Sequence, residues 1–174
     1  NYFADIMAGY WADNLTFWPH HHEGELDALL TFDTLVIGLE FKLDDPLSSD
    51  DTIDNHLPGQ NENAPLSCNQ LAREARIVQS LCRPGQRGLL LLIADQNVCR
   101  DIYADVLKRR ILPDDIPLGY LTWQDILSAL RSIKLIDPFQ DLILQDLIAL
   151  LTAKGFQRFT GCDLYDLPLT DANH

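Results

Sequence analysis

The chain has 174 residues, of which 47% are apolar and 22% are charged, the proportions of a soluble globular protein with room for one sizeable core. Its formal net charge of −13 argues against loose, non-specific binding to nucleic acid. No run of about 18 apolar residues occurs and no secretory signal pattern opens the chain, so neither a membrane span nor export is expected. The four cysteines form no CxxC pair, which favours free thiols in a cytoplasmic protein over a zinc site.

The basic residues are pooled in one part of this acidic chain. Residues 1–70 hold 13 acids and 1 base, residues 71–110 hold 4 acids and 8 bases, and residues 111–174 hold 9 acids and 4 bases. The pool is either an ordinary solvated helix face or a patch that binds phosphates. Its members are Arg73, Arg76, Arg83, Arg87, Arg100, Lys108, Arg109 and Arg110.

The first part of the chain predicts a helix, an edge strand and a polar loop. Residues 2–14 space their apolar side chains as a helix does, and we expect this helix to pack on a sheet. Residues 15–18 are short and aromatic and stop at Pro19, which is typical of an edge strand. The three histidines at 20–22 would point in different directions, so we expect a polar loop at the mouth of a site, with a metal role as the less favoured alternative.

The segment 24–42 predicts one β-hairpin whose turn is formed by Asp33 and Thr34. In this register, residues whose numbers sum to 67 lie opposite each other. One face of the hairpin is wholly apolar and should lie on a core. That face consists of Leu26, Ala28, Leu30, Phe32, Leu35, Ile37, Leu39 and Phe41.

The other face of the hairpin brings charged residues together. Asp27 is expected opposite Glu40, and Glu25 opposite Lys42. Like charges that face each other in a ladder are unfavourable by roughly a few tenths of a kcal/mol or more. A divalent cation between the two carboxylates reverses that sign, because hard cations such as Mg²⁺ bind carboxylate oxygens. The alternative is a plain solvated polar face of an antiparallel sheet.

Residues 43–65 differ from the rest of the chain, with five aspartates, three prolines and several Asn and Ser residues. We expect a long acidic loop with little order of its own. A loop of this length in a compact domain is usually functional or disordered. Because it follows Lys42 directly, it could be a lid or an insertion near the site.

Helices and strands alternate after the loop. Ser67 is the candidate N-cap of a helix that runs to about Cys82, with a buried stripe of Leu71, Ala75, Val78 and Leu81. The later elements are a turn at 83–88, a central strand at 88–94, a helix at 96–110, a strand at 118–121, a helix from Thr122 to about Ile133, and a helix from Asp137 to about Lys154.

This order of elements predicts an α/β fold in which helices flank a mixed β-sheet on both faces. We expect a single domain over residues 1–174, with the acidic loop at 43–65 and an acidic, aromatic tail at 156–174. No internal repeat is present.

The hairpin and the helix that follows it resemble the PD-(D/E)XK nuclease superfamily. Asp27 is followed thirteen residues later by Glu40-Phe-Lys42, and the next helix carries Gln70. The stretches GELDALL and LVIGLEFKL resemble the family's two active-site strands, and NQLAREARI resembles its following helix. Over about residues 1–95, the resemblance implies a restriction-endonuclease-like core with the order αβββαβ.

The sequence also departs from the family pattern. Leu26 stands where the motif's name has Pro, and position 74 is Glu where the RecB-like subgroup has Tyr. No Glu lies in the first predicted helix, so only Asp5 or Asp13 could supply an N-terminal carboxylate.

The resemblance implies an enzyme that hydrolyses DNA phosphodiester bonds with Mg²⁺, for which Mn²⁺ can substitute. Asp27 and Glu40 would bind the metal, helped by the Phe41 carbonyl. Lys42 would orient the attacking water or stabilise charge on the phosphate, and Gln70 would lie near the site. The remaining implied residues are Glu25 as an auxiliary and Arg73, Arg76, Arg83 and Arg87, with Lys108, Arg109 and Arg110, as contacts to the DNA backbone.

Two other hypotheses stay open. The chain could be a catalytically inactive nuclease-fold module that binds a protein partner or a second copy, through the aromatic segment 2–18 or the tail. It could also be an acidic mimic of nucleic acid, although the basic pool at 71–110 speaks against that hypothesis.

Overall fold

The computed structural model describes residues 14–43, 47–51 and 66–157 of the chain. It divides into two compact units, residues 1–126 and residues 127–174. The predicted helix at 2–13, most of the acidic loop and the tail from 158 onward lie outside the described residues. In the part of the chain that is described, no helix is both long and apolar enough to cross a membrane.

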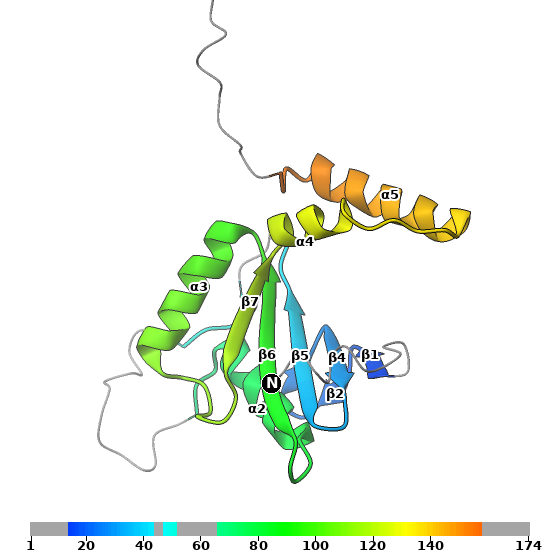
Figure 1. The fold of residues 1–174 in the computed structure, drawn as a ribbon. Helices are drawn as coiled ribbons and strands as arrows, with labels where there is room; N and C mark the ends of the chain where they lie inside the picture. The colour runs from blue at the N-terminus through cyan, green and yellow to red at the C-terminus, as the bar shows by residue number, and fades with distance from the viewer. Residues whose placement is uncertain (1–13, 44–46, 52–65, 158–174) are drawn as a thin grey trace, which may run out of the picture. The chain divides into compact units, whose positions relative to one another are not determined.

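A five-stranded mixed sheet forms the centre of the first unit (Figure 1), made of β1 (Leu15–Phe17), β4 (Ala28–Thr31), β5 (Leu35–Phe41), β6 (Arg87–Ala94) and β7 (Leu118–Thr122) in this spatial order. The first three strands are antiparallel neighbours, whereas β6 and β7 run parallel to β5. The coarse α/β prediction is therefore confirmed, with β1 at the edge as expected.

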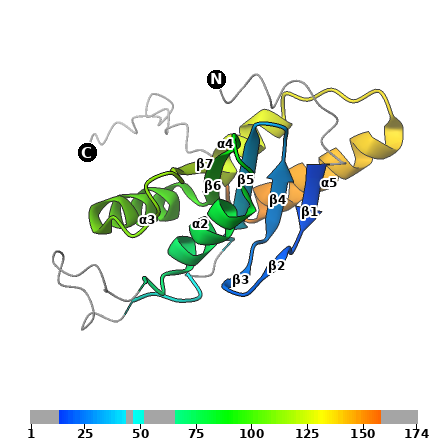
Figure 2. The same cartoon turned by 90° about the horizontal axis from the view of Figure 1, so that it is seen from below.

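The helices of the first unit connect the parallel strands. α2 (Gln70–Leu81) leads from β5 to β6, and α3 (Gln96–Arg109) leads from β6 to β7. Both helices pack on the same face of the sheet, as Figure 2 shows, in one shared apolar cluster. A short separate hairpin of β2 (His20–His21) and β3 (Gly24–Glu25) lies between β1 and β4 in the sequence.

The second unit contains α5 (Pro138–Ala153), and α4 (Trp123–Leu130) spans the boundary between the units. The Thr122 Oγ1 accepts a hydrogen bond of 3.0 Å from the Asp125 N–H, which caps α4 as predicted. Asp137 caps α5 through the Phe139 N–H at 2.9 Å. The helix ends before Gly155, whose φ of 82° suits a residue without a side chain.

The predicted register of the β4–β5 hairpin is confirmed. All four observed pairs sum to 67, beginning with Ala28 opposite Leu39. Beside the turn, the Phe32 N–H donates to the Leu35 carbonyl at 2.8 Å, so two residues form the turn. This register brings the start of β4 and the end of β5 to the same edge of the sheet.

The predicted pairing of Glu25 with Lys42 is wrong. Glu25 pairs with His20 in the β2–β3 hairpin, where the ring nitrogen lies 3.2 Å from the carboxylate. Gly24, which pairs with His21 in this hairpin, has a φ of 143°, a backbone conformation that residues with side chains rarely adopt. The Lys42 N–H instead donates to the Ile93 carbonyl of β6 at 2.8 Å.

Both faces of the sheet are apolar. The predicted hairpin face forms one cluster, of Ala28, Leu30, Phe32, Leu35, Ile37 and Leu39, with Phe41 packed against it. Leu26 is the exception, because it lies before β4 begins and packs in the α2 cluster instead. Val36 and Leu29 line the α2 side.

α2 begins two residues later than predicted. Asn69 is its N-cap, and its side chain accepts from the Leu71 N–H at 3.0 Å. Ser67 stands outside the helix and accepts from the Asn69 N–H at 3.2 Å. Leu81, expected in the buried stripe, is 39% exposed at the last turn.

α2 packs closely against β5 at Gly38, so a substitution at this position tests the packing of the fold. A Cβ added at Gly38 would lie 2.5 Å from the Val78 Cγ2. Because valine has a stiff χ1, Gly38→Ala should lower the free energy of unfolding by about 1–3 kcal/mol, measured by urea denaturation. Gly119→Ala is the matched control, because its Cβ would meet the side-chain ends of Leu91 at 3.3 Å and Leu89 at 3.8 Å. An equal loss in both variants would contradict the packing.

Candidate active site

Polar residues from β4, β5 and α2 meet at one edge of the sheet. Asp27 precedes β4, and its Oδ2 accepts from the Phe41 N–H at 2.7 Å, which ties the carboxylate to the end of β5. Glu40 is buried one residue before the end of β5, and Lys42 directly follows the strand. Gln70 is the first residue of α2. The predicted catalytic set is thus gathered at one place, although its members are distant in the sequence.

The Glu40 carboxylate is the centre of this group. The residue is 3% exposed, and its Oε1 lies 2.9 Å from the Lys42 Nζ. The Gln70 Nε2 donates to the same oxygen at 2.6 Å. Burial, and then the charge of Asp27, raise the pKa of Glu40, while Lys42 acts in the opposite direction.

The side-chain amide of Gln70 has a defined orientation. Its Oε1 accepts from the Ser48 N–H at 2.8 Å, so its nitrogen must face the carboxylates. The Gln70 Nε2 donates both to Glu40 and, at 2.7 Å, to the Glu74 Oε1. Ser48, in the acidic loop, is therefore part of the support of the site.

Glu74 is a residue of the site that the sequence analysis missed. It is 2% exposed, and its Oε2 is buried without a hydrogen-bond partner among the described residues. Burial and the charge of Glu40 raise the pKa of Glu74 to about 9. The sequence feature that could have identified Glu74 is its spacing of four residues from Gln70, which puts both side chains on one face of the helix.

A polar cavity of about 160 Å³ adjoins the group from the side of the β2–β3 hairpin. Gln70 and Glu74 form one wall of it, and Glu25, the predicted auxiliary, forms part of another. Glu25 therefore faces the same cavity as Glu74, although its carboxylate is paired with His20.

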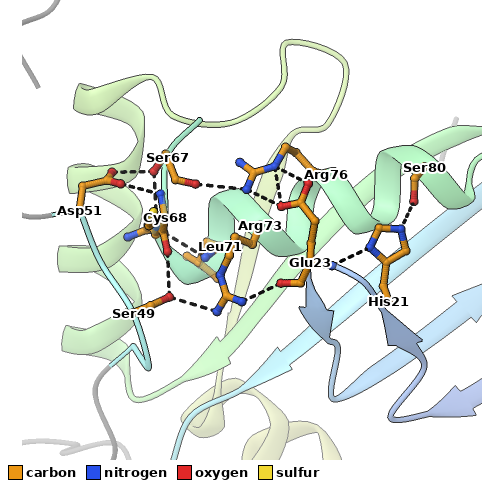
Figure 3. Close-up of polar contacts among 11 residues, drawn as sticks. His21, Glu23, Ser49, Asp51, Ser67, Cys68, Leu71, Arg73, Arg76 and Ser80 are labelled. Carbon is orange, nitrogen blue, oxygen red and sulfur yellow. Dashed lines mark hydrogen bonds and ion pairs between the residues drawn. The ribbon is translucent and has the colours of Figure 1, made fainter. Parts of the chain in front are cut away.

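Two of the arginines that were predicted to contact the DNA backbone bind other groups of the protein (Figure 3). The Arg76 guanidinium binds both carboxylate oxygens of Glu23, at 2.9 and 2.8 Å from its Nε, and lowers the pKa of that acid. The Arg73 Nη1 donates to the Glu23 carbonyl at 2.7 Å, and its Nη2 to the Ser49 Oγ at 3.1 Å. These contacts hold the β2–β3 hairpin and the loop against α2.

The other two predicted arginines lie at the opposite end of the sheet. Arg87 pairs with Leu35 at the start of β5, five residues before Glu40. At a rise of about 3.3 Å per residue, the separation along the strand is about 17 Å. Arg83 is exposed in the turn just before β6. The structure does not bring Arg83 and Arg87 to the carboxylates.

The histidines at 20–22 lie in and beside β2 rather than in a simple loop. The His21 Nδ1 accepts from the Glu23 N–H at 3.2 Å, and its Nε2 lies 3.2 Å from the Ser80 Oγ. The first bond lies within the hairpin, and the contact with Ser80 attaches the hairpin to α2. Over residues 14–43, 47–51 and 66–157, no three His, Cys, Asp or Glu side chains are grouped as ligands of one metal ion.

The predicted metal set is of another kind, with two carboxylates and the Phe41 carbonyl. Its charge suits a divalent cation, because the carboxylates of Asp27 and Glu40 lie near each other with one lysine beside Glu40. The residues present therefore fit Mg²⁺ or Mn²⁺ at Asp27 and Glu40.

Comparisons with protein-family models, with curated proteins and with solved structures found no match to this chain.

The proton held by Glu74 predicts a pH dependence of stability. The folded chain keeps Glu74 protonated to about pH 9, whereas the unfolded chain releases that proton near 4.5. The free energy of unfolding should therefore fall as the pH rises between these values. Glu74→Gln, which stays neutral, should lose this part of the decline and exceed the wild type in stability near the upper value.

Urea unfolding across this pH range, with a chelator present, measures the effect. Glu25→Gln is the control, because its side chain is 47% exposed. Parallel pH profiles for the wild type and Glu74→Gln would show that Glu74 is ionised in the folded chain.

Proposed function

We propose that this chain is a metal-dependent nuclease of the PD-(D/E)XK type that hydrolyses phosphodiester bonds of DNA. The observation that carries the proposal is the buried contact of 2.9 Å between the Lys42 Nζ and the Glu40 Oε1, beside Asp27 and under Gln70. A partly buried lysine and a buried carboxylate at a strand end, with a second carboxylate one strand away, are the parts that such hydrolysis requires.

The order of the elements also supports the proposal. Three antiparallel strands, β1, β4 and β5, are followed by α2 and then by the parallel strand β6. This order is compatible with the βββαβ part of the core that the resemblance implies, if the β2–β3 hairpin is counted as an insertion after the first strand. The exact fold within the α/β class belongs to the proposal.

Each residue has a part in the proposed reaction. Asp27 and Glu40 would hold Mg²⁺ or Mn²⁺, with the Phe41 carbonyl. When bound, the cation supplies charge neutralisation at the phosphate and lowers the pKa of water. The Lys42 ammonium would stabilise the charge that develops on the phosphate oxygens, or orient the attacking water.

Gln70 and Glu74 would act on Glu40. The Gln70 Nε2 donates to Glu40 and Glu74 at once, which keeps the two carboxylates at a defined distance. A neutral Glu74 avoids a second buried negative charge beside Glu40.

Purified protein with Mg²⁺ or Mn²⁺ should cut a substrate from a panel of single-stranded, duplex and branched DNA. Glu40→Ala and Lys42→Met should each lower the cleavage rate by about 10²–10³-fold, because each removes charge stabilisation at the reacting group. In calorimetric titration, Glu40→Ala should also lose Mn²⁺ binding, whereas Lys42→Met should keep it.

Asp114→Asn is the control, because Asp114 is exposed in the connection before β7. Thermal unfolding of each variant separates loss of activity from loss of fold. A wild-type protein that binds neither metal and cuts no substrate would refute the proposal.

A second candidate function is a protein-binding module, and it rests on an exposed edge. β1 is the edge strand of the sheet, and at its end Phe17 is 56% and Trp18 65% exposed. Their rings are 5.6 Å apart, and Trp18 has a positive φ of 49°, which is uncommon for a bulky side chain. Edge strands with exposed apolar residues often pair with another chain.

This candidate predicts a stoichiometric complex that depends on the edge and not on the carboxylates. A pull-down with the wild type as bait should retain the partner in Glu40→Ala and lose it in Trp18→Ser. A complex that Glu40→Ala abolishes, or that Trp18→Ser leaves intact, would remove the support for this candidate.

A further inference from the structure

The described part of the acidic loop, Leu47–Asp51, lies between the start of α2 and the end of α3. We call it the 47–51 segment. It approaches the candidate site at one end, where the Ser48 N–H donates to the Gln70 Oε1 at 2.8 Å. At the other end, Asp51 meets Arg109 in the last turn of α3. The segment therefore runs from the site to the basic end of a neighbouring helix.

The middle of the 47–51 segment is bound to the start of α2. The Ser49 carbonyl accepts from the Gln70 N–H at 3.0 Å, and the Ser49 Oγ donates to the Cys68 carbonyl at 2.8 Å. The Arg73 Nη2 donates to the same hydroxyl at 3.1 Å. Figure 3 shows the Ser49 hydroxyl between Cys68 and Arg73.

The Asp51 carboxylate occupies a cradle of three donors. Its Oδ1 accepts from the Cys68 N–H at 2.6 Å, and its Oδ2 accepts from the Ser67 hydroxyl and the Arg109 Nη2, each at 2.6 Å. A backbone N–H, a hydroxyl and a guanidinium are the groups with which proteins bind phosphate oxygens.

Asp50 adds a second anion to the same guanidinium. Its Oδ1 lies 2.8 Å from the Arg109 Nη2 and accepts from the Asn69 Nδ2 at 2.9 Å. Arg109 lowers the pKa of Asp50 to about 2, so this acid is charged at neutral pH. Arg109 and Arg73, two members of the basic pool, are therefore engaged by loop groups.

We propose that the 47–51 segment is an internal mimic of a nucleic-acid backbone. Its two carboxylates occupy the phosphate-binding donors at Arg109 and the Cys68 N–H until a nucleic acid displaces them. The contact is autoinhibitory, because Arg109, which Asp105 of its own helix also binds, cannot bind a phosphate while the two loop acids hold it. The inference rests on the proposed function for the class of ligand, an oligonucleotide.

The experiment measures binding of a short fluorescent single-stranded DNA by anisotropy, with a chelator present so that no strand is cut. Asp50→Asn/Asp51→Asn should raise the affinity by about tenfold or more, the effect of one gained charge-assisted contact. The plot of log affinity against log salt should steepen by about 0.7 for each phosphate contacted. Adding Arg109→Gln should abolish the gain.

A charge-matched control separates a freed site from a less acidic chain. Asp33→Asn/Asp146→Asn removes the same charge at two exposed positions that lie far from Arg109 in the sequence. The proposal is overturned if the loop variant gains no more affinity than this control, or if the gain survives Arg109→Gln.

The Asp51 side chain is only 6% exposed, so its variant could fail to fold. Asp50→Asn alone, at a side chain that is 52% exposed, then tests the same effect. A second measurement on the wild type is hydrogen exchange of the 47–51 segment. Faster exchange when the DNA binds supports displacement, and unchanged exchange contradicts it.

The outcomes distinguish this inference from the proposed function. If cleavage depends on Glu40 but the loop variant gains no affinity for the oligonucleotide, the proposed nuclease function stands and the proposal of an internal mimic is refuted. If the loop variant gains affinity but no substrate is cut, the proposal of an internal mimic stands and the proposed nuclease function is refuted.

Discussion

The burial of the Glu40 carboxylate is the constraint on which the rest of this structure depends. A charge removed from water costs several kcal/mol unless opposite charge and hydrogen bonds replace the water. Here Lys42 and Gln70 supply them, both at the same oxygen. α2 begins close to the end of β5, which places Gln70 beside Glu40, and the Ser48 N–H holds the carbonyl oxygen of the Gln70 amide. Strand, helix and loop are therefore tied to one side chain.

α2 uses its polar residues in two directions. Gln70 and Glu74, four residues apart, face the carboxylate of β5, whereas Arg73 and Arg76 face the β2–β3 hairpin. Because all four are bonded inside the first unit, the helix is fixed by polar contacts on two sides as well as by its apolar stripe. The same bonds explain why a basic pool in the sequence does not by itself make a basic surface.

The elements that local pattern determines were predictable. Alternation of period two and a two-residue turn were enough to give the register of β4 and β5, which then brought Asp27 and Glu40 to one edge. The Asn69 cap was missed because Ser67 is an equally good local candidate, and the choice depends on a contact with Asp51. Sequence patterns carry little information about such long-range contacts.

The burial of Glu74 and the contacts of Arg73 and Arg76 within the protein were missed for the same reason. A glutamate on a helix is normally solvated, and only the sheet beneath it makes Glu74 a buried acid. The sequence alone does not show which group an arginine binds, so a phosphate is a plausible acceptor. For Arg73 the acceptor is the Glu23 carbonyl, fifty residues away in the chain. In this protein an acid of the hairpin pairs with Arg76 of α2, and two acids of the loop pair with Arg109 of α3. A ligand rich in phosphate would therefore have to compete with carboxylates held at high local concentration, which favours a ligand that binds at several points together.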